Sequence, residues 1–285
     1  MLEVILDTLI DSIKLLPFLF ITYLIMEYIE HKTGDKAKNT IKKSGRFGPL
    51  IGSVLGGFPQ CGFSVSATNL YAGRVITLGT LIAVYLSTSD EMLPIFISEA
   101  VSPVIIFKIL GIKLVIGIIA GFAIDFIIRL INKNKEVEEK IVDICEHEHC
   151  HCEENNIFKS ALKHTVNIFL FIILITFIIN IAVYLIGEET IAGLLLNKKV
   201  LGPVITALIG LIPNCASSVI LTNMYLENVI SSSSMIAGLL TGAGVGLAVL
   251  FKINKGVKEN IKIVSLLYFI GVISGIVLEL IGLSI

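Results

Sequence analysis

Long apolar stretches separated by short polar ones dominate the chain. A helix needs roughly 20 residues to cross the hydrocarbon core of a bilayer, and most of these stretches reach that length. The pattern therefore predicts an all-α polytopic membrane protein. The predicted segments are 8–30, a broken segment at 48–72, 75–98 and 103–131, followed, after a charged stretch at 132–157, by 159–187, 200–226, 230–251 and 262–284.

The second half of the chain repeats residues of the first at a constant offset of 154 positions. Chance does not readily place matching Pro-x-Cys and Thr-Asn elements at one offset. The sequence therefore predicts two transmembrane repeats, 1–131 and 159–285, joined by a linker at 132–158. The matching pairs are Gly48-Pro49 with Gly202-Pro203, Pro59 with Pro213, Cys61 with Cys215, Ser64 with Ser218, Thr68-Asn69 with Thr222-Asn223, Gly117 with Gly271, Gly121 with Gly275 and Asp125 with Glu279.

Lysine and arginine gather in the loops 31–47 and 252–262 and in the linker. If the broken segments 48–72 and 200–226 re-enter on one side, each half crosses three times, the halves are inverted, and all three Lys-bearing loops are cytoplasmic. If these segments span, the halves are parallel and the linker lies outside. The positive-inside rule favours the first arrangement. We expect two inverted repeats, each with three spanning helices and one Pro-broken re-entrant hairpin, about ten helical segments in all.

Composition supports the membrane assignment. The 285 residues are 55% hydrophobic and 16% charged, whereas an ordinary soluble domain has about 25% charged residues. The formal net charge of −1 gives no basic footprint for nucleic acid. These values argue against a soluble enzyme, a disordered protein and a nucleic-acid binder, and they predict an integral membrane protein. We expect it in a prokaryotic-type plasma membrane.

Each half carries a Pro-x-Cys sequence inside an apolar segment. Proline interrupts a helix, and broken backbone at membrane depth is tolerated only in a protein-lined or wet cavity. Cys61, Ser64 and Thr68 share one helical face beyond the first break, so we expect a substrate site between the two breaks; for the Ser and Thr residues, helix packing is an equal alternative. The predicted binding residues are Pro59, Gln60, Cys61, Ser64, Thr68, Asn69, Pro213, Asn214, Cys215, Ser218, Thr222 and Asn223.

Two adjacent acids, Asp90 and Glu91, lie inside the predicted segment 75–98. A charge at membrane depth costs at least about 2.5 kcal/mol. We therefore predict that one of them binds an ion or accepts a proton. The alternative is that this segment is short and that 87–91 forms an interfacial turn.

The linker contains three cysteines and three histidines within eight residues. This composition is typical of a metal-binding tract, and thiolate and imidazole suit zinc, copper(I), nickel, cobalt or trivalent arsenic. The alternative is a solvated acidic linker. The predicted ligands, expected on the cytoplasmic side, are Cys145, His147, His149, Cys150, His151 and Cys152.

The paired motifs Phe-Pro-Gln-Cys-Gly-Phe-Ser at 58–64 and Ile-Pro-Asn-Cys-Ala-Ser-Ser at 212–218, joined by a Cys/His-rich linker, resemble the ten-transmembrane heavy-metal exporter family. Its members are labelled arsenic-efflux proteins or manganese transporters. The resemblance implies a metal or metalloid efflux permease. We expect export of a divalent cation such as manganese, zinc or cobalt, or of an arsenic species, by alternating access. The alternative is a secondary transporter of a small organic solute with a metal-sensing loop.

Enzymatic activity is not expected. The His-Glu-x-x-His letters at 147–151 lie in a polar tract without a helical pattern, whereas the metalloprotease motif needs a helix. The expected partners are the lipid bilayer, the metal or metalloid and a coupling proton or ion, with a homodimer as one option and no nucleic acid. No cofactor is required, because a metal ion enters as substrate or as a ligand of the linker.

Overall fold

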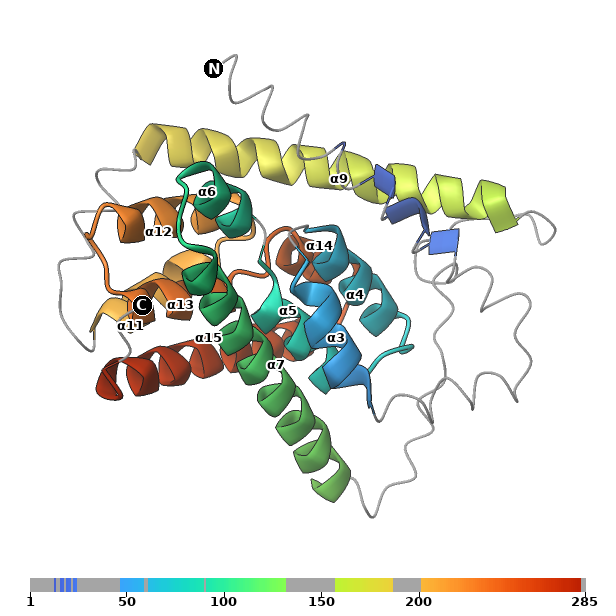
Figure 1. Cartoon of the computed structure of the whole chain (residues 1–285). Coiled ribbons are helices and arrows are strands. Elements are labelled where there is room, and N and C mark those ends of the chain that lie inside the picture. Colours follow the sequence, from blue (N-terminus) through green and yellow to red (C-terminus); the bar gives the residue numbers. More distant parts are fainter. Residues whose placement is uncertain are drawn as a thin grey trace.

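The computed structural model describes residues 47–58, 61–89, 91–131, 157–186 and 201–282, together with positions 13, 16–17, 19–21 and 23–24. Within these ranges every regular element is a helix, which confirms the all-α prediction (Figure 1). The helices before the linker are α3 (Gly48–Gly56), α4 (Gly62–Ala72), α5 (Leu78–Ser87), α6 (Met92–Ser98) and α7 (Pro103–Ile131). Those after it are α9 (Ile157–Ile186), α11 (Leu201–Gly210), α12 (Ala216–Leu226), α13 (Ser232–Thr241), α14 (Gly246–Ile253) and α15 (Val257–Leu280).

Five stretches of the described residues are long and apolar enough to cross a membrane. Helices α7 and α15 and the Ala161–Ile178 part of α9 are continuous. The other two, Leu78–Ser98 and Ser232–Ile253, reach the length only when α5 is taken with α6, and α13 with α14. The continuous helices α7 and α15 have exposed apolar side chains on their outer faces, such as Phe107 and Phe269. Such exposure is expected for side chains that contact lipid.

The prediction of continuous helices over 75–98 and 230–251 is wrong, because each segment is broken near its middle. In the first, α5 ends at Ser87 and α6 begins at Met92, which agrees with the alternative of a turn at 87–91. Here the Ser87 and Thr88 hydroxyls donate hydrogen bonds to carbonyls of the preceding turn at 2.7 and 2.8 Å. This bonding pattern competes with continuation of the helix. In the second, Gly242 ends α13 and Gly244 has a φ of 54°, which glycine adopts without strain. Each half of the chain therefore has two broken helices.

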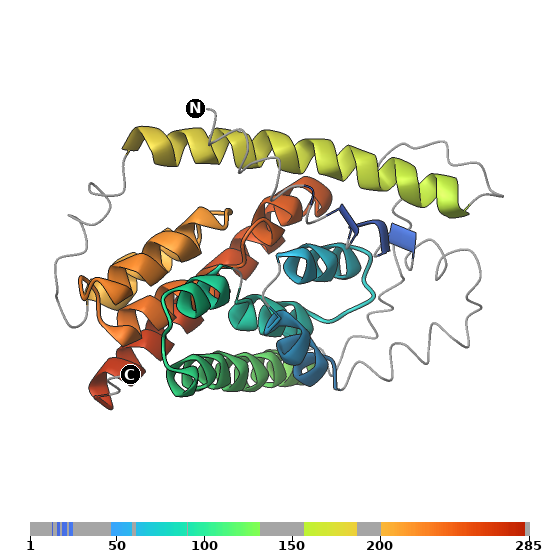
Figure 2. The same ribbon diagram turned by 45° about the horizontal axis from the view of Figure 1, so that its top comes forward.

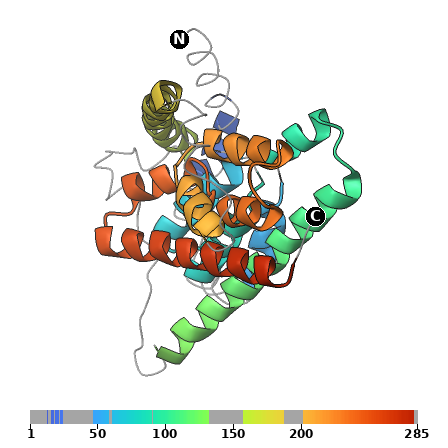
Figure 3. The ribbon, with the colours of Figure 1, turned by 90° about the vertical axis from the view of Figure 1, so that its left-hand side faces the viewer.

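The two broken helices α5 and α13 form the centre of the molecule. All residues of both helices except Leu78 at the start of α5 are buried. Helices α3 and α7 pack on α5, and α11 and α15 pack on α13. The long helices α7 and α15 run at an angle to each other (Figure 3), and α9 lies along one side of the molecule (Figure 2).

The shorter helices that follow the breaks, α4, α6, α12 and α14, make contacts between the two halves. Helix α14 packs against α4, and α12 packs against α6; in Figure 1, α14 accordingly lies beside α4 and away from α11 and α13. The two halves are therefore interleaved, and four helix breaks lie in the part of the molecule where they meet.

The same local contacts occur in both halves. Thr77 caps the N-terminus of α5 and Ser231 caps that of α13, each accepting a hydrogen bond from the backbone N–H three residues on. Asp125 accepts hydrogen bonds from the Thr77 hydroxyl at 2.7 Å and the Gly79 N–H at 2.9 Å. Glu279 accepts one from Ser231 at 3.0 Å. These matching acids stabilise the positive N-terminal ends of α5 and α13. The two acids are therefore equivalent in the sequence because they perform the same structural role in both halves.

Candidate functional site

The sulfur atoms of Cys61 and Cys215 lie 2.8 Å apart, and both side chains are buried. Each cysteine precedes a helix, α4 and α12 respectively. The two cysteines are 154 positions apart, so the contact joins equivalent positions of the two halves. The contact places two thiols at the positive ends of two helix dipoles, an environment that favours negative charge.

The residues after each cysteine form the same hydrogen bonds in both halves. Ser64 donates to the Cys61 carbonyl and Ser218 to the Cys215 carbonyl, each at 2.8 Å. One turn later Thr68 donates to the Ser64 carbonyl at 2.7 Å, and Thr222 repeats that bond to Ser218 at 2.6 Å. These bonds tie the hydroxyls to their own helices, and Thr68 in addition donates to the Gly246 carbonyl of the second half.

Backbone at the second break is held by a neighbouring amide side chain. The Asn214 Oδ1 atom accepts a hydrogen bond from the Cys215 N–H at 2.7 Å, and Asn214 is buried. Pro213, just before it, is half-buried. Asn214 thus satisfies one of the free amides that a helix start leaves and fixes the backbone that carries the thiol.

Thr68 also connects the first half to the break between α13 and α14. Its hydroxyl oxygen lies 2.6 Å from the Tyr85 hydroxyl and 3.2 Å from the Gly246 carbonyl. A Cβ atom at Gly246 would contact Ser64, so glycine is what lets α14 approach α4 here. The predicted face of Cys61, Ser64 and Thr68 therefore lies against the second half rather than against lipid.

Asn69 takes part in a polar chain that crosses three segments. Its Oδ1 atom accepts a hydrogen bond from the Tyr23 hydroxyl at 3.0 Å. The Tyr23 ring stacks on the His164 ring of α9, with centroids 5.5 Å apart, and all three side chains are buried. The equivalent residue in the second half, Asn223, is half-buried on α12.

Several predicted site residues lie outside the described part of the chain. Glu91 is described: it is half-buried and immediately precedes α6. In the described ranges no group of three or more His, Cys, Asp or Glu side chains could hold a metal ion, and Cys61 and Cys215 form a pair of thiols. The predictions that fall outside are Pro59, Gln60, Asp90, Cys145, His147, His149, Cys150, His151 and Cys152.

Residues 1–187 match the sequence model of a family described as "Putative, 10TM heavy-metal exporter". The chain belongs to this family. The matched residues include Cys61 and end before Cys215. No curated protein and no solved structure gives a match. The family and the apolar helices together make this an integral membrane protein related to heavy-metal exporters, as the resemblance implied.

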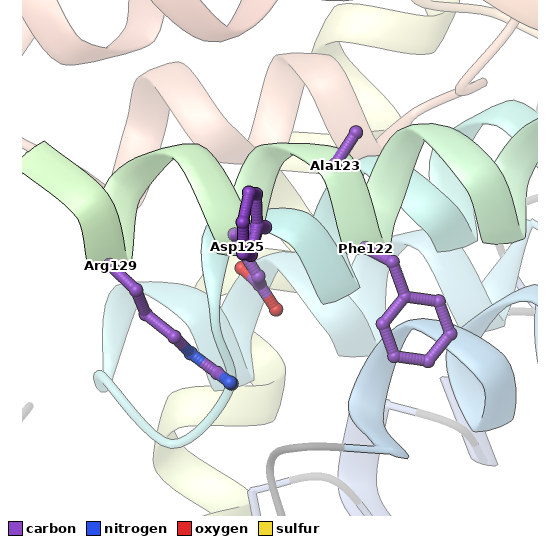
Figure 4. A pocket seen from close by; sticks show the side chains of 5 residues that line it. Phe122, Ala123, Asp125 and Arg129 are labelled. Atoms are coloured by element: carbon purple, nitrogen blue, oxygen red, sulfur yellow. The ribbon is translucent and has the colours of Figure 1, made fainter.

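Two cavities in the described part of the chain have linings that do not include the thiols. One, of 390 Å³, is lined by Phe122, Ala123, Asp125, Phe126 and Arg129; Figure 4 shows Asp125 and Arg129 on the same side of α7. Because both Asp125 oxygens already cap α5, this carboxylate serves the helix end. The other, of 280 Å³, is largely apolar and lies among α3, α4 and α5.

An ion pair links the two halves at the end of α4. Arg74 donates to both carboxylate oxygens of Glu259 at 2.8 and 3.0 Å, and the Tyr71 hydroxyl donates to the same carboxylate. The hydrogen bonds to Glu259 raise the pKa of the Arg74 guanidinium above its ordinary value. Both charged side chains are about a third exposed, so the pair contributes little to stability and serves mainly to set the position of the loop after α4.

Two buried polar side chains were missed in the sequence. Tyr85 is the hydroxyl partner of Thr68, and nothing in an apolar segment distinguishes a tyrosine that donates from one that only packs. Lys113 is buried inside α7. A lone lysine in the middle of a predicted span was the available signal. It was not selected because the segment 103–131 was assigned as a span from its average hydropathy alone.

Proposed function

We propose that this protein exports a heavy-metal ion or metalloid across the membrane, with Cys61 and Cys215 as the soft ligands of the transported species. The observation that carries the proposal is the 2.8 Å contact between the two sulfur atoms. Thiols select soft and borderline metals over hard ones such as calcium. Each cysteine also immediately precedes a helix, α4 or α12, at the positive end of its dipole. Packing alone does not require the two thiols to lie at such positions.

The geometry around the thiols suits alternating access. Broken helices that meet between two repeats are the usual substrate site of secondary transporters. We infer that the halves are inverted, that α3–α4 and α11–α12 are re-entrant hairpins, and that rocking of one repeat against the other exposes the cysteine pair to each side in turn. Asn69, Asn214 and Asn223, together with the Ser and Thr hydroxyls, supply neutral oxygens beside the path.

Glu91 and its neighbour Asp90 are proposed as the charge partners of the substrate. Carboxylates favour a divalent cation over an oxyanion, whereas an uncharged arsenic species needs only the thiols. The linker ligands Cys145, His147, His149, Cys150, His151 and Cys152 would capture metal on the cytoplasmic side and deliver it for export. A metal ion is therefore a substrate here and not a resident cofactor.

The proposal is tested with a panel of metals in a sensitive bacterial host. Wild type, Cys61→Ser and Cys215→Ser are expressed at matched levels and challenged with manganese, zinc, cobalt, copper and arsenite. We expect wild type to lower the cell content of at least one of these, and each serine variant to lose about ten-fold or more of the export rate, since loss of partners behind a metal ligand already costs that much. Cell metal content is read by mass spectrometry.

The matched control replaces the three linker cysteines by serine. This variant keeps both membrane thiols and is expected to retain basal export with a weaker response at low metal concentration. The proposal is wrong if wild type leaves the content of every metal unchanged, or if both membrane variants export at the wild-type rate.

A further inference from the structure

A buried lysine of α7 contacts backbone carbonyls from both halves of the chain. The Lys113 Nζ atom donates to the Leu239 carbonyl of α13 at 3.0 Å and to the Thr88 carbonyl. Only 1% of the residue is exposed. An ionisable side chain at membrane depth is costly and marks a functional position by default, and this one joins α7 to both central broken helices.

Both carbonyls lie at the C-terminal end of a broken helix. Thr88 immediately follows α5, and Leu239 lies in the last turn of α13, where the Ala243 N–H binds the Thr241 carbonyl. The C-terminal ends of helix dipoles attract positive charge. Interrupted helices of membrane transporters commonly bind a free sodium ion or proton at such ends.

The break that supplies the Thr88 carbonyl is rich in hydroxyl side chains. Ser87, the last residue of α5, and the following Thr88 and Ser89 are all buried, and their hydroxyls donate to carbonyls of the same segment. On the other side, Thr241 ends α13 and is also buried. Oxygen ligands are those that hard cations prefer, and the two carbonyl oxygens that contact the ammonium are of the kind that hold an alkali cation.

The second half has no equivalent charge. The position that matches Lys113 at the repeat offset is Leu267, a fully buried core residue of α15. Duplicated packing therefore does not need a lysine here, since leucine fills the same place in the other repeat. The charge is a departure from the repeat, made where the two halves meet.

We propose that Lys113 is a tethered cation that fills a monovalent-cation site formed by the carbonyl ends of α5 and α13. Its covalently attached ammonium takes the place of a free alkali ion and neutralises two negative helix ends that must lie side by side. One consequence, which rests on the proposed export function, is that the wild-type protein transports without sodium or potassium as coupling ion. The site itself is independent of the substrate.

The test measures the thermal unfolding of purified full-length protein in detergent. Wild type, Lys113→Ala and Lys113→Gln are compared in sodium, potassium and choline chloride at equal ionic strength. We expect wild type to unfold at the same temperature in all three salts. Lys113→Ala should be destabilised in choline, and sodium or potassium should raise its midpoint saturably by about 3 °C or more. Lys113→Gln keeps a polar but uncharged side chain at this position, and its midpoint should also depend on the cation.

Lys108→Ala is the matched control, because Lys108 lies on the same helix and is exposed; its midpoint should not depend on the cation. The proposal is overturned if both Lys113 variants fold but unfold at the same temperature in the three salts. It is equally overturned if they stay unfolded in sodium and potassium, since a free cation then fails to replace the ammonium.

A second arm measures metal export in vesicles with and without sodium and potassium. Wild-type export should be unaffected by these ions, whereas Lys113→Ala should export only when one of them is present. Export that needs sodium or potassium in wild type contradicts the tethered cation. An inactive wild type contradicts the export function alone, because the unfolding measurements still decide the cation site.

Discussion

Mild oxidation should join Cys61 to Cys215 and stop transport. Their sulfur atoms lie 2.8 Å apart, and a disulfide needs about 2.05 Å, so less than about 1 Å of approach is required. The two thiols give two electrons and two protons to the oxidant as the S–S bond forms. If the halves move against each other during transport, the bond should abolish most of the export rate, and a reducing agent should restore it.

The cross-link is detected by cutting the chain between the two cysteines. The linker cysteines are replaced by serine and a protease site is placed in the linker. After oxidation and cleavage, the two fragments should migrate together without reductant and separate with it. Cys61→Ser is the control and should give separate fragments throughout. Separate fragments in the two-cysteine protein would show that the breaks do not meet, whereas linked but still active protein would remove them from the transport movement.

Much of the fold follows from local chemistry in the sequence. The breaks before Cys61 and Cys215 were predicted because proline removes a helix donor. The offset between the halves also predicted that Asp125 and Glu279 are equivalent, although their role as helix caps became evident only from their contacts with Thr77 and Ser231. Sequence patterns indicate what repeats, whereas the contact partner depends on how the chain folds back.

The breaks after α5 and α13 show what periodicity cannot supply. No proline marks either one. Asp90 and Glu91 indicate a turn at 87–91 only as an alternative to an ion-binding site, and residues 242–245 carry no polar side chain at all. The first depends on hydroxyls of Ser87 and Thr88 that could equally point elsewhere, and the second on glycines that a membrane helix also tolerates. Likewise the contact of Thr68 with Gly246 joins residues 178 positions apart, which no local pattern encodes.

The Gly210→Ala variant should be among the most destabilised single substitutions in the protein. A Cβ atom at residue 210 would overlap the Gly238 carbonyl and the Thr241 hydroxyl of α13, so α11 would have to move away from the central helix. Overpacking of this kind costs about 1–3 kcal/mol. We expect the unfolding midpoint to fall by about 5 °C or more, with less protein reaching the membrane.

The equivalent glycine of the first half and a free glycine of α7 make the comparison decisive. Gly56 meets Ser87 and the Val84 carbonyl at the matching contact, so Gly56→Ala should be destabilised similarly. Gly111 has nothing within 4 Å of an added Cβ, and alanine is the better helix former by about 1 kcal/mol, so Gly111→Ala should unfold at the wild-type temperature or above. Equal midpoints for all three variants would mean that α3 and α11 do not approach the central helices at these glycines. A shift for only one of Gly56 and Gly210 would mean that the two halves do not share the contact.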